Sequence, residues 1–84
     1  MALMIIDVQV RPAVPDDDNV LSNEQRDELL RSVRAFIQAK WTAGWRGAGA
    51  MGHLLFGERK VHVVCMALQH IEGSNEGYFV ATYE

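Results

Sequence analysis

Residues 61–70 read VHVVCMALQH, and this stretch says more about the fold than any other part of the chain. Successive side chains of a strand point to opposite faces, and both alternating sets are apolar here. One set is Val61, Val63, Cys65 and Ala67, and the other is Val64, Met66 and Leu68. A strand that is apolar on both sides is typical of the interior of a sheet with two covered faces. We therefore expect this strand to lie centrally, with a layer packed on each face.

A long amphipathic helix is predicted before this strand, over residues 23–41. Ser22 followed by Gln25 is a capping-box pattern, which marks the start of the helix. Apolar positions recur at helical spacing and form one stripe: Leu29, Leu30, Val33, Phe36, Ile37 and Trp41. Polar residues lie on the opposite side, so one helix can cover one face of the sheet and leaves the other face open.

Three further strands complete the predicted sheet. Residues 3–10 (LMIIDVQV) form the first, residues 54–57 a short one, and residues 78–83 (YFVATY) the last, which we expect at an edge. Residues 57–60 would turn the chain, and residues 72–77 would form a hairpin loop. The order β-α-(β)-β-β predicts a single α+β domain over residues 1–84. Its sheet would be largely antiparallel with three or four strands and one amphipathic helix on one face.

The segment between the helix and the short strand is rich in glycine. Residues 42–53 contain Gly44, Gly47, Gly49 and Gly52, and this density predicts a loop. Residues 47–52 (GAGAMG) fit G-x-G-x-x-G, but in a dinucleotide site that pattern follows a strand and opens a helix. Here it follows a helix, so we expect no nucleotide. Either this segment or a second copy of the chain would cover the open face, which makes a homodimer an expectation.

The composition is that of an ordinary folded protein. The 84 residues are 49% hydrophobic and 23% charged, with a formal net charge of −3. A mildly acidic chain lacks the basic surface of nucleic-acid binders, so nucleic-acid binding through Arg31 and Arg34 is the least favoured hypothesis. Cys65 is the only cysteine, which excludes an internal disulfide and favours the cytoplasm. No apolar run approaches the ~18 residues of a membrane span, so no membrane partner is expected.

Few residues suggest catalysis or metal binding. Cys65 lies within the apolar strand, where burial would raise its pKa and leave it inert. His62 and His70 would share a strand face about 26 Å apart at ~3.3 Å per residue, too far to hold one metal ion. Residues 16–18 (DDD) lack the spaced ligands and the glycine of a calcium loop. We therefore expect no metal, no cofactor and no catalytic residue, and the balance is against an enzyme.

Residues 5–9 (IIDVQ) resemble the first strand of isochorismatase-like cysteine hydrolases, which carries a D-x-Q signature. The resemblance implies that Asp7 would work with a lysine and a nucleophilic cysteine, for which Lys60 and Cys65 are present. The continuation, residues 10–12 (VRP), departs from the family pattern, and the surroundings of Lys60 and Cys65 do not match it. We therefore do not assign the chain to this family.

Trp45, Arg46 and Met51 are the residues predicted to bind a partner. Tryptophan and arginine are enriched among the residues that dominate protein–protein binding energies, and these three lie in the glycine-rich segment. The favoured hypothesis is a small protein-interaction or regulatory module of the inhibitor or adaptor type common among mobile-element products. It would act by binding a protein partner.

The alternative hypothesis is a small-molecule-binding protein or small enzyme with a site at a homo-oligomer interface. A chain of this length could complete a pocket with residues of a second copy. Asp7, Arg46 and His62 would be its ligand-binding residues, since they are the polar groups that stand out in or near the predicted elements.

Overall fold

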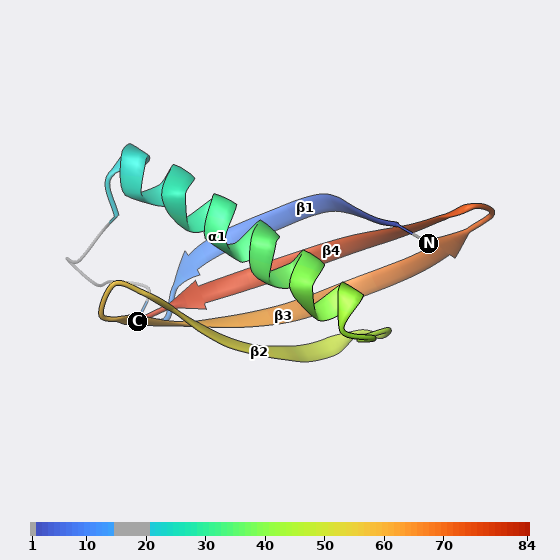
Figure 1. Cartoon of the computed structure of the whole chain (residues 1–84). Coiled ribbons are helices and arrows are strands. Elements are labelled where there is room, and N and C mark those ends of the chain that lie inside the picture. The colour runs from blue at the N-terminus through green and yellow to red at the C-terminus, as the bar shows by residue number, and fades with distance from the viewer. Residues whose placement is uncertain (1, 15–20) are drawn as a thin grey trace.

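One helix packs on one face of a four-stranded sheet in the computed structural model, which describes residues 2–14 and 21–84 (Figure 1). The elements in chain order are β1 (Leu3–Pro12), α1 (Asn23–Thr42), β2 (Gly49–Phe56), β3 (Arg59–Ile71) and β4 (Ser74–Tyr83). The strand order is β1-β4-β3-β2, with β1 and β4 parallel and the other neighbours antiparallel. The predicted α+β class is therefore confirmed. The aspartate run at 16–18 lies outside the described residues.

The helix begins where the capping box predicts. Ser22 Oγ accepts a hydrogen bond from Gln25 N at 3.2 Å, and Ser22 N donates to Gln25 Oε1 at 2.9 Å. These two bonds satisfy backbone donors that the first turn of a helix leaves without partners. The predicted stripe faces the sheet, and its buried members are Leu29, Val33, Ile37 and Trp41. In the described part of the chain, no helix has the length and apolar character needed to cross a membrane.

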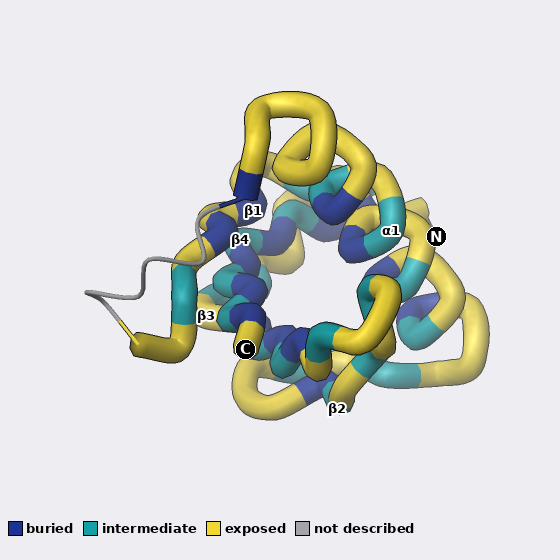
Figure 2. The backbone as a smooth tube through the Cα atoms, turned by 90° about the vertical axis from the view of Figure 1, so that its left-hand side faces the viewer, coloured by how far each residue is buried: buried dark blue, intermediate teal, exposed yellow. Residues whose placement is uncertain are grey.

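The core fills the space between α1 and the inner face of the sheet, which is the face turned toward the helix. Figure 2 shows buried stretches of the strands and of α1 on the two sides of this space. Five hydrophobic residues of β3 and β4 are at most 1% exposed: Val61, Val63, Cys65, Phe79 and Ala81. The placement of the VHVVCMALQH stretch in the sheet interior is thus confirmed, since β3 lies between β4 and β2.

The glycine-rich segment is partly a strand, so the prediction of a loop over residues 42–53 is wrong from Gly49 onward. β2 pairs with β3 from Gly49 to Phe56, and this pairing supplies the backbone hydrogen bonds that a loop would take from water. Gly52 has a φ of 145°, and a Cβ added there would lie 3.2 Å from Phe36 Cζ. Glycine therefore lets α1 pass close to β2 at this point.

Irregularities in three strands shift which residues face the core. The pairing register shifts between Ile5 and Asp7 in β1, between Ala50 and Gly52 in β2, and between Cys65 and Ala67 in β3. An extra residue in a strand exchanges the two faces for everything beyond it. The single unbroken alternation expected for the first strand and for residues 61–70 is therefore wrong, and Ile6 and Met66 are exposed.

The last strand lies in the interior of the sheet, so its predicted edge position is wrong. β4 is hydrogen-bonded to β1 on one side and to β3 on the other. Its pairing with β3 reaches Ser74, so the loop expected over residues 72–77 shrinks to a turn at Glu72 and Gly73. Periodicity alone cannot locate a strand within a sheet, because parallel pairing with β1 joins residues far apart in sequence.

Side chains of α1 occupy the free edge of β1. Arg26 donates to Val10 O at 3.1 Å, and Gln38 donates to Leu3 O at 3.0 Å. These bonds fill acceptor positions that another strand would otherwise use, which protects a sheet edge from pairing with a second chain. The edge of the sheet at β2 is the other one in the described chain.

Candidate interaction surface

The residues predicted to bind a partner do not form one exposed surface. Met51 is 6% exposed and belongs to the core. Trp45 is half-buried and packs against that core. Arg46 is exposed, but its guanidinium lies 3.7 Å from the centroid of the Trp41 ring and donates to Trp41 O at 2.5 Å and Trp45 O at 2.8 Å. These contacts close the C-terminal end of α1, since carbonyls of a last helical turn lack partners within the helix.

The alternative ligand-binding set is dispersed over the molecule. Asp7 of β1 pairs with Tyr78, and His62 of β3 pairs with Thr82. At about 4.8 Å between strands and 3.3 Å per residue, these pairings place Asp7 and His62 roughly 16 Å apart. Arg46 is held at the end of α1, which packs on the other side of the sheet. The three residues therefore do not converge on one ligand within a protomer.

Cys65 faces the core and Asp7 faces away from it. Cys65 is 1% exposed, and its thiol donates to Ala67 O at 3.4 Å. Burial raises the pKa of this thiol, although hydrogen bonds with the backbone of Ala67 and Tyr78 lower it in part. The expectation of a buried thiol with a raised pKa is confirmed. The geometry also separates Cys65 from Asp7 across the sheet, so the two do not form a hydrolase site.

The sheet face turned away from α1, called the outer face below, presents three rows of side chains. Burial alternates along β4, with Phe79, Ala81 and Tyr83 toward the helix and Tyr78, Val80 and Thr82 on the outer face. The pairing registers extend these positions across the sheet. The rows are Asp7–Tyr78–Ala67, then Gln9–Val80–Val64–Ala50, then Arg11–Thr82–His62–His53.

The centre of the outer face is apolar and its margins are polar. Val64 and Val80 pair directly with each other and are only partly buried. Ala50 flanks them on β2, and Leu55, further along that strand, is 74% exposed. Among the described residues no helix or strand packs on this face, which is also visible in Figure 2. Two covers were possible for this face, the glycine-rich segment or a second copy of the chain, and the first is wrong because that segment joins the sheet at the edge.

Two histidines meet on the outer face. His53 of β2 pairs with His62 of β3, and their rings are stacked with centroids 4.4 Å apart and planes 18° apart. Sequence reasoning misses this pair, because the glycine density of residues 42–53 predicts a loop at His53. A two-residue turn at Gly57 and Glu58 would have indicated it, since residues equally distant from such a turn face each other. His70 lies apart from both, beside the buried Asn75 with which it shares a side-chain hydrogen bond.

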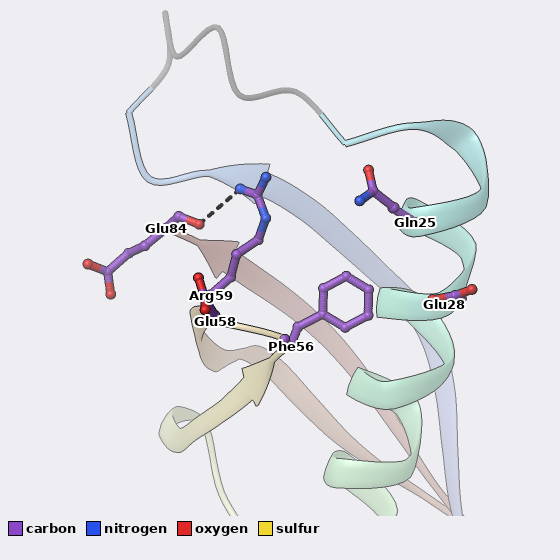
Figure 3. A pocket seen from close by; sticks show the side chains of 7 residues that line it. Gln25, Glu28, Phe56, Glu58, Arg59 and Glu84 are labelled. Atoms are coloured by element: carbon purple, nitrogen blue, oxygen red, sulfur yellow. Dashed lines mark hydrogen bonds between the residues drawn. The ribbon is translucent and has the colours of Figure 1, made fainter.

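A wide pocket of about 630 Å³ lies between the start of α1 and the β2–β3 turn (Figure 3). Phe56 and three acidic residues, Glu28, Glu58 and Glu84, are among the residues that line it. Arg59, the cation of this lining, donates to Glu84 O at 3.1 Å and lies 5.7 Å from the Tyr83 ring centroid. Its guanidinium thus holds β3 to the end of β4, and an anionic ligand here would meet the carboxylates.

Comparison of the chain with protein-family models, with curated proteins and with solved structures finds no match.

Proposed function

We propose that this chain is a protein-interaction module of the inhibitor or adaptor type, and that it binds its protein partner through the outer face. The observation that carries the proposal is the apolar centre of that face, formed by Val64, Val80 and Ala50, on which no described element packs. An uncovered apolar patch with polar residues around it is a feature of places where proteins associate.

The margins of the outer face support the same proposal. Asp7, Gln9 and Arg11 lie along β1 on one side, and the two histidines lie on the other. An apolar centre within a polar rim is the usual composition of a protein–protein interface, in which the rim sets orientation and the centre excludes water. An uncovered sheet face suits a partner that offers a helix or a second sheet.

The cytoplasm is the proposed setting of this interaction. Cys65 is a buried free thiol, which suits a reducing compartment.

Site-specific photo-crosslinking tests the proposed function. A photoreactive amino acid replaces Val80 on the outer face in one variant and Arg34 on the exposed side of α1 in the matched control. Both variants are irradiated in extract of the source cells, and the crosslinked peptides are identified by mass spectrometry.

The proposal predicts that the Val80 variant crosslinks to one defined protein at a consistent position and that the Arg34 variant does not. Equal crosslinking from the two positions would show that the outer face is not selective. Defined crosslinks from Arg34 alone would move the interaction to the helix side of the molecule.

A further inference from the structure

The two histidines on the outer face have a backbone spacing that would let both bind one metal ion. His53 and His62 are direct partners on neighbouring antiparallel strands, so their Cβ atoms are held about 4.5–5.5 Å apart. Their rings are already face to face, with centroids 4.4 Å apart. His53 is exposed and His62 half-buried, so the edges of both rings can be reached from solvent.

Binding one ion through both rings requires the two imidazoles to turn out of their stack. Zinc–nitrogen bonds of 2.0–2.1 Å in tetrahedral geometry require the two ligand nitrogens to be about 3.3 Å apart. Imidazole lone pairs lie in the ring planes, so rings stacked at 4.4 Å with planes 18° apart do not point at a common ion. Rotation of both side chains to other rotamers turns their nitrogens toward a common point above the sheet face. The sheet backbone fixes the separation in advance, so binding an ion orders only the two side chains.

Two imidazoles leave a tetrahedral ion incomplete. Within residues 2–14 and 21–84, no group of three or more histidine, cysteine, aspartate or glutamate side chains could hold a metal. A second copy related by a two-fold axis through the ion would contribute the same pair, and the ion would then have four imidazoles. Ala50 and Leu55 lie on the same face of β2 as His53, and the second copy would cover them.

We propose that His53 and His62 bind a divalent transition-metal ion of the class that prefers imidazole, represented by Zn²⁺, and that the ion joins two copies of this chain through their outer faces. The inference rests on the proposed function, because it names a second copy as a partner of the outer face. The chain's net charge of −3 adds repulsion between copies, which the positive ion offsets at the contact.

Native mass spectrometry and sedimentation velocity of the purified full chain test the proposal. The chain is stripped with EDTA and titrated with Zn²⁺. The expected result is a dimer carrying one Zn²⁺ per two chains, which returns to the monomer when EDTA is added. Co²⁺ in place of Zn²⁺ should give the visible absorption bands of a tetrahedral site as the dimer forms.

The three histidines provide matched variants. His53→Gln and His62→Gln should each weaken Zn²⁺-dependent dimerisation at least tenfold, because removing one imidazole per chain leaves the ion with two protein ligands in the dimer. His70→Gln should dimerise like the unaltered chain, since His70 contacts Asn75 on the side of β3 and β4 that faces the core. Circular dichroism checks that all three variants fold.

Several results would overturn the proposal. The first is binding of one Zn²⁺ per monomer without dimerisation. The second is a dimer that persists both in EDTA and after the His53→Gln change. The third is a loss of Zn²⁺-dependent dimerisation in His70→Gln as large as that in His53→Gln. The two proposals can fail separately. If the Val80 crosslink to a different protein persists in EDTA while Zn²⁺ fails to pair the chain, the interaction module stands and the metal-linked dimer falls. If Zn²⁺ pairs the chain but no protein crosslinks to Val80 except a second copy, the inhibitor or adaptor role falls.

Discussion

Gly77 lies beneath the ring of Phe79, two positions further along the same face of β4. A Cβ at position 77 would come within 2.5 Å of Phe79 Cζ and 2.7 Å of its Cε2. The ring cannot move aside freely, because Phe79 is 1% exposed and belongs to the core. Gly77→Ala should therefore lower the free energy of unfolding by about 1–3 kcal/mol, as overpacking of a core does.

Urea denaturation measures this change, with Gly47→Ala as the control. A Cβ at Gly47 would meet nothing within 4 Å, so that variant should change the free energy of unfolding by only a few tenths of a kcal/mol. Equal effects of the two substitutions would contradict the tight contact between Gly77 and Phe79.

The raised pKa of Cys65 makes a prediction about alkaline pH. Burial favours the neutral thiol, so the folded state holds the proton more tightly than the unfolded state, whose thiol has a pKa near the ordinary value of 9.0. The stabilisation is complete below that unfolded value and is lost as the pH rises through the higher folded pKa. The melting temperature of the unaltered chain should therefore fall, relative to that of Cys65→Ala, as the pH rises above 9.0.

Thermal scans of both proteins across this pH range test the prediction. A constant difference in melting temperature would show that Cys65 does not titrate with unfolding. The same burial predicts that a thiol reagent at pH 8 reacts with Cys65 only as fast as the fold opens.

At the scale of elements, the capping box stabilises the first turn of α1. Ser22→Ala removes the hydroxyl that accepts from Gln25 N and should lower the free energy of unfolding by about 1 kcal/mol. Gln25→Ala removes the reciprocal bond to Ser22 N. Since the two bonds form one motif, the double variant should lose less than the sum of the two single losses, which a double-mutant cycle by urea denaturation measures. Strict additivity would show that the two bonds act independently.

Local signals predicted α1 well and β2 poorly, for a physical reason. The cap at Ser22 and the apolar stripe of the helix depend on residues three or four positions apart. β2 depends on pairing with β3 and on the approach of Phe36 to Gly52, neither of which has a signal in residues 42–53. Because β2 was not predicted over its full length, the His53–His62 pair was not predicted either. The inversions of face in β1 and β3 arise at single extra residues that an alternating pattern does not reveal.

At the scale of the whole molecule, side chains of α1 form hydrogen bonds with the sheet edge at β1. The edge at β1 is occupied by Arg26 and Gln38, which donate to Val10 O and Leu3 O. The double variant Arg26→Ala/Gln38→Ala should expose this edge and increase aggregation on prolonged warming. It should also lower the free energy of unfolding by about 1 kcal/mol per lost hydrogen bond.

Light scattering below the melting temperature measures the aggregation. Arg34→Ala on the exposed side of α1 serves as the control, since it removes an arginine without touching β1. Equal scattering from the control and the double variant would show that net charge, rather than edge protection, keeps the chain dispersed.

The parallel pairing of β1 with β4 also governs when this chain can fold during its synthesis. β1 leaves the ribosome before the other described strands, yet its neighbour in the sheet is β4, the last of them. Leu3 pairs with Asn75 and Val10 pairs with Ala81, so the pairing that completes the sheet joins residues far apart in the sequence. The β3–β4 hairpin can form by itself, but the nascent β1 and α1 must keep their apolar sides exposed until it arrives. The sheet can therefore close only after β4 has been translated, and a chaperone can bind the exposed apolar sides before that point.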